Sequence, residues 1–331
     1  MLLILGASGY VGQAFVRELR RRDAPFIPLA RTDLDYGSFE LLLDYVRRVN
    51  PRWVLNAAGY WGTTAGGAWE VNRDLAFKAN ALLPQTVSRV CMLMKIPCAH
   101  VSSSSIYSGA KVLERGCTRG ERSLDTPAIT ELFERQPERF FGFTELDPPN
   151  SSFRNFPCSV LSGTRALGEE NLRGAEQTYI WRISMPLDHT PSPHNWLAQF
   201  QAGRRLRNHV TSLSHLTEFA GACLDLAERR APFGTYNVAN PGAVSARQAA
   251  SIIQRATESD DSSVFTASHL PSGVIDEQAS RSSCILDVTK LLRAGVQMRS
   301  AQQALADCIQ HAVSVRAASS VCFDPALNRV S

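Results

Sequence analysis

Long hydrophobic runs and a one-sided charge are both missing from this sequence of 331 residues. It has no run of the roughly 18 apolar residues that a membrane-spanning helix needs, so we expect no membrane span. The apolar start MLLIL has no basic residues and meets glycines at once, which is not the pattern of a signal peptide. The net charge of +4, from 35 basic and 31 acidic residues, is too small to indicate a nucleic-acid or anionic-membrane partner.

Cysteine motifs that bind metal are missing as well. The eight cysteines are spread along the chain without a CxxC, and no Cys/His cluster has the spacing of zinc ligands. We therefore expect no metal, and small reduced thiols in a cytoplasmic protein. Lysine is scarce, with 4 residues against 31 arginines, which we interpret as coding bias rather than as 31 binding contacts.

The first half of the sequence alternates short apolar runs with amphipathic stretches. Strands without polar alternation, separated by helices, are typical of a parallel sheet that is covered on both faces. The pattern predicts an α/β fold with a doubly wound parallel sheet. The expected strands are 2–5, 26–29, 53–56, 98–101 and 179–183, and the expected helices are 10–22, 39–49, 75–94 and 162–173.

Two regions follow from this pattern. Residues 1–180, with a returning segment near 213–240, are expected to form the sheet domain. Within them, residues 109–150 are rich in Gly, Pro, Arg and Glu, which suits an active-site cover or a plain surface insertion. A Pro/His/Ser stretch then breaks the pattern, so we expect 181–315 to form mainly a smaller substrate-binding region, followed by a tail at 316–331.

The strongest local signal is the sequence GASGYVG, which follows the first strand and opens the first helix. Glycines allow a tight turn there, and the N–H groups and dipole at the start of a helix favour a pyrophosphate. We therefore expect this loop to bind a dinucleotide, rather than to serve only close packing. The expected contacts are Gly6, Ser8, Gly9, Tyr10, Val11 and Gly12.

The end of the second strand indicates which dinucleotide binds. About 20 residues past the glycines, an acidic residue would contact the ribose 2′-hydroxyl of NAD, whereas an arginine accommodates the 2′-phosphate of NADP. This place holds Ala30-Arg31-Thr32, with Asp33 and Asp35 close behind. We expect NADP as the cofactor, bound in part by Arg31, with NAD as the alternative.

Further motifs follow in order along the chain. The third strand ends in Asn56-Ala57-Ala58-Gly59, the next helix carries Asn80, and the fourth strand runs into Val101-Ser-Ser-Ser-Ser-Ile-Tyr107. Together with the glycine loop, these motifs resemble the extended short-chain dehydrogenase/reductases over residues 1–310. The resemblance implies a Rossmann domain with a smaller C-terminal region. It also implies cofactor contacts at Asn56, Ala57, Ala58, Gly59 and Asn80.

Four segments narrow the resemblance to one branch of that family. Arg31–Asp35 and Ile285–Lys290 are similar to the dTDP-4-dehydrorhamnose reductase branch. Met185-Pro186 and Gly234–Ser245 are similar to the plant-type rhamnose-synthesis epimerase/reductases. The resemblance implies a nucleotide-activated sugar as the small-molecule substrate and, by family habit, a possible homodimer.

The same resemblance implies a catalytic set: a Ser or Thr at a strand end, and a Tyr and a Lys one helical turn apart. Ser103 takes the place of the Ser or Thr. In the helix SVLSGTRALGEE, the Tyr place holds Leu161 and the Lys place holds Arg165. Leucine carries no proton, so the usual acid is absent, while Arg165 could still hold the nicotinamide ribose by hydrogen bonds.

One literal Tyr-x-x-x-Lys does occur, from Tyr107 to Lys111, directly after the strand end. The Ser-Gly between the two residues predicts a turn, so we do not expect a helix that presents both side chains on one face. Tyr107 is a candidate for a relocated proton donor, or for a pocket-lining or packing residue. We interpret Lys111 as a solvated loop charge.

The remaining candidates belong to the substrate side. We expect substrate contacts from Tyr60, Trp61, Ser104, Tyr107, His194 and Asn195. Ser103 and Ser104 could instead satisfy only backbone groups at the strand end. His189 could act as a general base, although a surface-loop position is the simpler interpretation.

Two functional classes remain. The first is an NAD(P)-dependent enzyme that reduces or epimerises a nucleotide-activated sugar with a non-standard active site, and its catalytic candidates are Ser103, Tyr107 and Arg165. The second is a family member that kept the dinucleotide site but lost redox turnover, so that the cofactor has a structural, regulatory or non-redox role. The pair Leu161 and Arg165 is the feature that supports the second class.

Overall fold

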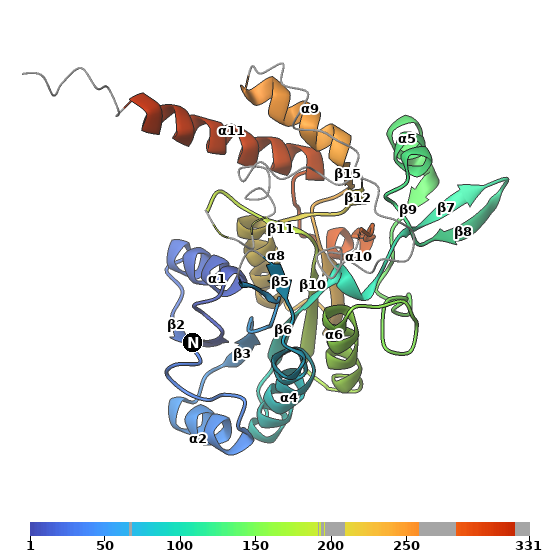
Figure 1. The fold of residues 1–331 in the computed structure, drawn as a ribbon. Helices are drawn as coiled ribbons and strands as arrows, with labels where there is room; N and C mark the ends of the chain where they lie inside the picture. The colour runs from blue at the N-terminus through green and yellow to red at the C-terminus, as the bar shows by residue number, and fades with distance from the viewer. Residues whose placement is uncertain (66–67, 191, 193–194, 196–208, 258–282, 322–331) are drawn as a thin grey trace, which may run out of the picture.

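The computed structural model describes residues 1–65, 68–190, 192, 195, 209–257 and 283–321 (Figure 1). Its largest element is a six-stranded sheet in the order β14-β10-β6-β3-β1-β2, and every neighbouring pair is parallel. This confirms the α/β fold class with a parallel sheet. The strands are β1 (Leu2–Leu5), β2 (Phe26–Leu29), β3 (Trp53–Asn56), β6 (Cys98–Ser103), β10 (Thr178–Ile183) and β14 (Gly234–Val238).

Both faces of the sheet are buried. Consecutive side chains of a strand point to opposite faces, so each strand contributes to two hydrophobic cores. In β1, Leu2 and Ile4 belong to one hydrophobic core, and Leu3 and Leu5 belong to another. All four side chains are at most 3% exposed. The uninterrupted apolar strands of the sequence are therefore strands that two cores cover.

Helices supply the cover on each face (Figure 1). Helices α1 (Tyr10–Arg21) and α8 (Leu216–Glu228) contribute to the first core. Helices α2 (Phe39–Val49) and α4 (Leu83–Met94) contribute to the second. Helix α6 (Val160–Asn171) packs against α4 and β6, and it thereby stands close to the strand end that the motifs single out.

The helix expected over 75–94 is divided into three parts. The short α3 (Arg73–Ala76) runs into the π-helical segment η1 (Phe77–Leu82), and α4 follows. The predicted helix is confirmed, but it contains a π-helical segment that the sequence did not reveal. The widened turn holds Asn80 where the chain meets α6, so closely that a Cβ on Gly168 would lie 2.1 Å from the Asn80 carbonyl oxygen. Such π-helical turns occur frequently at functional sites.

The excursion at 109–150 has structure of its own and projects to the right of the sheet in Figure 1. Isolated bridges join it to the C-terminal part of the chain at Cys284 and Leu286. It contains an antiparallel three-stranded sheet and two short helices: β7 (Ala110–Glu114), β8 (Cys117–Glu121), β9 (Phe140–Phe141), α5 (Pro127–Arg135) and η3 (Pro137–Arg139).

The C-terminal region forms a smaller core of its own around Leu187, Leu213, Val244 and Leu305. Its helices α9 and α11 lie side by side at the top of Figure 1. The chain between 209 and 257 contributes to both regions, since α8 and β14 belong to the large sheet domain. The elements of this region are β11 (Pro186–Leu187), β12 (Val210–Thr211), β13 (Ser214–His215), β15 (Val244–Ser245), α9 (Ala246–Thr257) and α11 (Ala301–Val321). Helix α10 (Thr289–Arg293) instead packs against β14 and contributes Leu291 to the first core.

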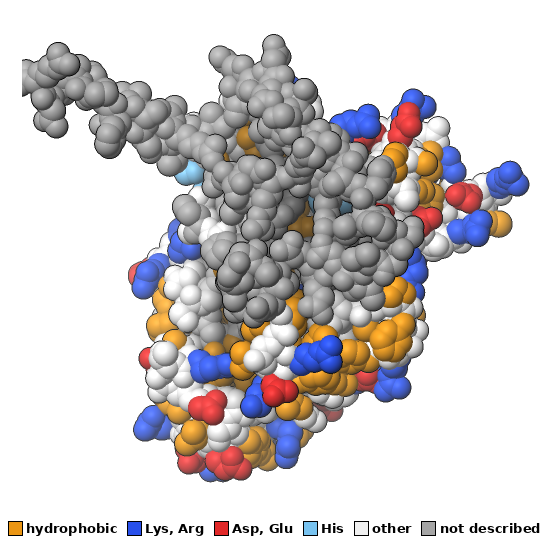
Figure 2. Space-filling view, viewed as in Figure 1, with side chains coloured by type: hydrophobic (Ala, Val, Ile, Leu, Met, Phe, Trp, Pro, Cys, Tyr) orange, Lys and Arg blue, Asp and Glu red, His pale blue; other side chains and the backbone are white. Residues whose placement is uncertain are grey.

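The described surface mixes charges of both signs. Figure 2 shows basic and acidic side chains interspersed over the described part of one face, in keeping with the small net charge. Among the described residues, none of the helices combines the length and the apolar character that crossing a membrane requires.

Candidate functional site

The strand order places the candidate site between β1 and β3. From β1 the chain moves to β2 on one side and then crosses back to β3 on the other. Ligands of open α/β sheets bind outside the carboxyl ends of the strands at such a reversal. Gly6–Gly12 follows β1 and Asn56–Gly59 follows β3, so the structure brings the two predicted cofactor segments together at this point.

The glycine loop is shaped so that side chains cannot be added at its two ends. Gly6 has a φ of +76°, and a Cβ there would lie 2.6 Å from the Ala58 Cα. A Cβ on Gly12 would lie 2.1 Å from the Gly6 carbonyl oxygen. The loop therefore needs glycine both for its left-handed turn and for the close approach of α1 to the strand end.

The N-terminus of α1 is left open. Gly9 stands at the N-cap, the described residues give the first turn no side-chain cap, and no acidic residue lies in that turn. By contrast, the Oγ of Ser38 caps α2, accepting the N–H of Leu41 at 3.4 Å. Since Ser8 and Gly9 are also exposed, the N–H groups and dipole of α1 are available to an anionic ligand.

The end of β2 presents a cation to the same edge of the sheet. Arg31 is exposed, with its guanidinium carbon 5.9 Å from the centre of the Tyr36 ring. The nearest acid, Asp33, is turned back on the chain, where its Oδ2 accepts the N–H of Ala30 at 2.9 Å. The carboxylate is thus engaged by the backbone, while the guanidinium is accessible.

Two asparagines hold the loop that follows β3. Asn56 is fully buried, and its Oδ1 accepts the N–H of Ala58 at 3.1 Å. The Oδ1 of Asn80 accepts the N–H of Tyr60 at 2.8 Å, while its Nδ2 donates to the Tyr60 carbonyl at 3.0 Å. Both predicted residues therefore shape the loop, and of the two only Asn80 also borders the cavity beside it.

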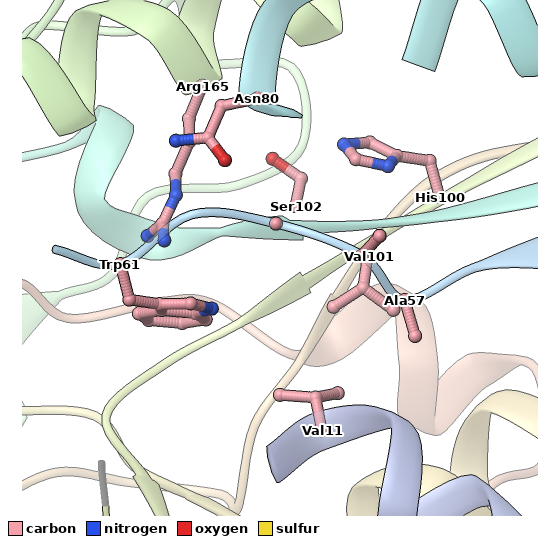
Figure 3. A pocket seen from close by; sticks show the side chains of 10 residues that line it. Val11, Ala57, Trp61, Asn80, His100, Val101, Ser102 and Arg165 are labelled. Carbon is pink, nitrogen blue, oxygen red and sulfur yellow. The ribbon is translucent and has the colours of Figure 1, made fainter. Parts of the chain in front are cut away.

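A small cavity of about 20 Å³ lies at this edge of the sheet, large enough for a water molecule. Figure 3 shows that its walls come from α1, the segment after β3, the strand β6 and the helix α6. The structure thus joins predicted cofactor residues with Arg165. The lining residues are Val11, Ala57, Ala58, Gly59, Trp61, Asn80, His100, Val101, Ser102 and Arg165.

Arg165 is the charged group of the cavity. Its side chain is buried, and it donates to the Ser105 Oγ and to the Tyr60 carbonyl, both at 3.3 Å. Its guanidinium carbon lies 3.9 Å from the centre of the Trp61 ring, and Figure 3 shows the guanidinium pointing toward that ring. The indole therefore covers the cation on the side of the loop after β3.

No carboxylate among the described residues forms an ion pair with Arg165. Burial lowers the pKa of the guanidinium to about 9, so it still carries its charge at neutral pH. A buried cation without a counter-charge costs free energy, which only neutral hydrogen-bond acceptors and the Trp61 ring offset here. The arrangement can accept an anion or a developing oxyanion.

His100 is a cavity residue that sequence reasoning missed. It is buried in β6, and its Nδ1 lies 3.2 Å from the Asn56 Nδ2. Burial lowers the pKa of the imidazole to about 4, so the ring is neutral near pH 7. The available signal was strand periodicity, because His100 shares one side of β6 with Ser102 two residues later.

The four serines at the end of β6 divide between two roles. The Oγ of Ser103 accepts the N–H of Ser105 and caps the short turn η2 (Ser104–Ile106). Ser104 donates to the Ser184 Oγ at 2.9 Å. Ser102 lines the cavity and Ser105 contacts Arg165. Ser102 and Ser105 therefore belong to the site, whereas Ser103 caps the turn that carries Ser105 and Ser104 bonds to Ser184.

Tyr107 lies outside the cavity, in contrast to its expected place in the pocket. It is 0% exposed, and its ring stacks on Phe143 with the centroids 4.5 Å apart. Its hydroxyl donates to the Asp147 carbonyl at 2.7 Å and accepts from the Arg182 Nη1 at 2.9 Å. Burial raises the pKa of the phenol. These contacts favour the packing role that the sequence left open over a role as proton donor or substrate contact.

Lys111 lies in β7 rather than one helical turn after Tyr107. Its Nζ binds both carboxylate oxygens of Asp147, at 2.8 and 2.6 Å. It is therefore a half-buried ion-pair partner and not a solvated loop charge. The expectation that no helix presents this pair is confirmed.

The other candidates are distributed as follows. Leu161 is buried in α6, one turn before Arg165. Tyr60 reaches the site through its backbone, while its hydroxyl accepts the N–H of Asn72 at 2.9 Å. Asn195 is buried and donates to the Asp188 carbonyl at 2.6 Å. His194 lies outside the described residues.

Known proteins resemble this chain along most of its length. A bifunctional dTDP-4-dehydrorhamnose 3,5-epimerase/dTDP-4-dehydrorhamnose reductase of Arabidopsis thaliana is 24% identical, covering 92% of this chain and 90% of that protein. A trifunctional UDP-glucose 4,6-dehydratase/UDP-4-keto-6-deoxy-D-glucose 3,5-epimerase/UDP-4-keto-L-rhamnose-reductase of the same plant is 24% identical over 73% of this chain. The chain spans only 32% of the length of that trifunctional relative.

Two solved structures share the fold. The L780 UDP-rhamnose synthase of Acanthamoeba polyphaga mimivirus superposes with a TM-score of 0.72 at 16% identity, covering 94% of this chain and 98% of that one. The dTDP-4-dehydrorhamnose reductase of Bacillus anthracis, solved in complex with NADP, superposes with a TM-score of 0.67 at 18% identity, covering 92% and 96%. The model of the RmlD substrate binding domain matches residues 1–314. The chain therefore belongs to the RmlD substrate binding domain family.

Proposed function

We propose that this protein binds NADP(H) at the glycine loop and reduces a keto group of a nucleotide-activated sugar, with a non-standard active site centred on Arg165. The observation that carries the proposal is the buried Arg165 guanidinium, which stands beside both cofactor loops without a carboxylate partner among the described residues. The desolvation free energy of such a charge is offset when an anionic or oxyanionic group binds next to it.

The residues at the carboxyl edge of the sheet fit a phosphorylated dinucleotide. The open N-terminus of α1 suits the pyrophosphate, and the turn through Gly6 and Gly12 has no room for side chains. Arg31 suits a 2′-phosphate, because it is exposed while Asp33 is engaged by the backbone. These features favour NADP, and they leave NAD as the weaker ligand.

Arg165 has a defined part in the chemistry. When bound, NADPH supplies the hydride for the reduction of a carbonyl group. The carbonyl oxygen then gains negative charge, which a guanidinium held in a water-poor site stabilises strongly. A guanidinium releases protons reluctantly, so we assign the final proton to a water molecule in the small cavity beside Arg165, and the hydroxide that remains takes up a proton from the solvent. The Trp61 ring must leave the guanidinium for a ligand to take its place.

A second candidate function rests on the missing acid. Leu161 stands where the family resemblance implies a tyrosine, and the Tyr107 hydroxyl is engaged in the core. A protein with these features can bind the dinucleotide without oxidising or reducing it. In that case Arg165 serves a regulatory or non-redox ligand, and bound NADPH remains unchanged in the presence of any keto sugar.

Calorimetric titration of the full chain with NADPH, NADP⁺, NADH and NAD⁺ tests the cofactor part of the proposal. We expect saturable binding, with NADPH and NADP⁺ bound more tightly than NADH and NAD⁺. Gly12→Ala should abolish this binding, because its Cβ would meet the Gly6 carbonyl oxygen at 2.1 Å. Gly120→Ala is the matched control, since a Cβ there meets nothing within 4 Å.

Two results would overturn the cofactor assignment. The first is the absence of binding for all four nucleotides by a protein that melts cooperatively. The second is binding that survives unchanged in a folded Gly12→Ala variant. The first result would mean that the ligand of this edge of the sheet belongs to another chemical class, and the second would mean that the dinucleotide binds away from the glycine loop.

A further inference from the structure

Two histidines and a cysteine from distant parts of the chain meet beside the C-terminal core. His189 follows β11, His215 stands at the N-cap of α8, and Cys308 lies in α11. Each offers one ligand atom, and these atoms all lie within 4.8 Å of one another. His215 and Cys308 are buried and His189 is exposed. The sequence did not reveal this cluster, because the fold and not the spacing brings the three residues together.

The buried ring of His215 has one nitrogen without a hydrogen-bond partner. Its Nδ1 accepts the N–H of Glu218 over a long 3.4 Å, whereas its Nε2 has no partner among the described residues. The residue is only 3% exposed, so water does not readily satisfy this atom. An unsatisfied polar atom in such a place destabilises the fold unless a ligand engages it. Burial lowers the pKa of the ring, and the neutral imidazole is the form that binds metal ions.

Each histidine also has a carboxylate beside a ring nitrogen. The Asp307 Oδ2 lies 3.3 Å from the Nε2 of His189, and the Glu218 Oε1 lies 3.7 Å from the Nδ1 of His215. Metal-bound imidazoles usually donate their second N–H to a carboxylate or carbonyl, which sets the tautomer and the orientation of the ring. Metal binding at Nε2 therefore requires the His215 proton to move to Nδ1, where it faces the Glu218 carboxylate and replaces the contact that Nδ1 now accepts from the Glu218 N–H.

We propose that His189, His215 and Cys308 bind a Zn²⁺ ion that joins α11 to the start of α8. Imidazole nitrogen and thiolate sulfur are the ligands that zinc prefers in proteins. His311 lies one turn after Cys308 on α11, with its ring centroid 4.4 Å from that of His189, but its ring nitrogens are not among the clustered ligand atoms, so a water molecule would complete a tetrahedral site.

The present separation requires only a modest closure. Zinc bonds of about 2.0–2.3 Å place tetrahedral ligand atoms roughly 3.5 Å apart, which is shorter than the 4.8 Å limit of this cluster. Rotation of the exposed His189 side chain supplies the difference. Burial raises the pKa of the Cys308 thiol, so the ion has to displace the thiol proton when it binds.

The test uses the metal-stripped full chain and adds Co²⁺ as a spectroscopic probe for Zn²⁺. We expect one equivalent to bind, with a visible ligand-field spectrum and a thiolate-to-cobalt charge-transfer band, and Zn²⁺ to displace it. Zn²⁺ should also raise the melting temperature, and a chelator should reverse the increase.

Variants decide whether the band arises at this cluster. Cys308→Ser should remove the charge-transfer band, and His189→Gln should weaken binding at least tenfold while leaving the buried residues intact. Cys117→Ser is the matched control, because Cys117 is an exposed thiol outside the cluster and its loss should change nothing.

Three results would overturn the proposal. They are the absence of binding at one equivalent, a band that persists in Cys308→Ser, and a band that disappears in Cys117→Ser. If Cys308→Ser fails to fold, then the His189→Gln variant decides alone, since unchanged affinity in that variant contradicts the site.

Discussion

Two buried arginines stand close to the end of β6, and their surroundings differ. Arg182 of β10 is 4% exposed, and its Nη2 binds the Glu169 Oε2 at 2.7 Å. It also donates to the Tyr107 hydroxyl at 2.9 Å. Arg165 of α6 is 8% exposed, and its only described contacts are two hydrogen bonds of 3.3 Å and the Trp61 ring.

The difference separates a structural charge from a charge that is available to a ligand. Glu169 compensates Arg182 fully and ties it to the strand, because Ser102 donates to the same carboxylate at 2.5 Å. Arg165 has no such partner among the described residues and faces a cavity. A fold that merely needed to fill this space would do so at lower cost with an apolar side chain. Charge compensation, rather than burial, therefore distinguishes the two arginines.

The largest effect is expected on the compensated side. Arg182→Met leaves the Glu169 carboxylate buried without its cation, so the free energy of unfolding should fall by about 3–5 kcal/mol. Urea denaturation followed by circular dichroism measures this loss. A loss below about 1 kcal/mol would show that the ion pair is no better compensated than Arg165, and the comparison would fail.

Acid should destabilise the fold through His100, a buried residue of β6 that lines the cavity beside Arg165. Its pKa is lowered to about 4 by burial, while the unfolded chain takes up the proton near 6.5. The contribution of the neutral ring is therefore fully present above pH 6.5 and is lost as the pH falls toward 4, by about 3 kcal/mol in total. Denaturation midpoints between pH 4 and 8 check this.

His100→Gln provides the control for that pH dependence. A glutamine does not titrate, so the variant should lose less stability than the parent protein between pH 6.5 and 4. Equal slopes in the two proteins would assign the acid sensitivity to other groups.

Arg165→Met should separate stability from function. Removal of an uncompensated charge should change the free energy of unfolding by no more than about 1 kcal/mol, in contrast to Arg182→Met. If the charge stabilises an oxyanion, turnover of NADPH with a keto sugar should fall about 100-fold or more. A large loss of stability would mean that Arg165, too, is a structural charge.

Arg31→Ala extends the comparison to an exposed arginine. Loss of a charged contact to the 2′-phosphate should weaken NADPH binding about tenfold or more and leave NADH binding unchanged. Parallel calorimetric titrations with the two nucleotides measure the change in preference. Equal weakening of NADPH and NADH binding would show that Arg31 does not contact the 2′-phosphate.

The smallest effect is expected for Tyr107→Phe. The variant keeps the stacked ring but loses the hydroxyl bonds to Asp147 and Arg182, which should cost about 1–2 kcal/mol of stability. Turnover per folded molecule should not change, because the hydroxyl does not reach the cavity. Abolished turnover at unchanged stability would restore Tyr107 as the proton donor.

Much of the frame could be predicted from the sequence. The strands of the sheet read as uninterrupted apolar runs because two cores bury them, and β1 shows this directly through Leu3 and Ile4. The glycine loop was recognisable because a left-handed turn and a close helix approach leave few other residues possible.

The side chains of the site were harder to predict. Ser103 was chosen because its position matches the family motif, and four consecutive serines offer no apolar alternation that would have indicated Ser102 or Ser105. The π-helical segment that contains Asn80 lies close to Gly168 of α6, and such a tertiary contact is not contained in helix propensity. The cluster of His189, His215 and Cys308 is formed by three elements that only the tertiary fold brings together.

We propose above all that the uncompensated charge of Arg165 promotes the reduction of the substrate at a functional dinucleotide-binding site. The most direct test follows the absorbance of NADPH with the full chain and a UDP- or dTDP-linked 4-keto sugar, in parallel for the parent protein and Arg165→Met. We expect oxidation of NADPH that depends on the keto sugar and that nearly disappears in the variant. NADPH that binds but stays unoxidised with every keto sugar, or oxidation that Arg165→Met leaves unchanged, would contradict it.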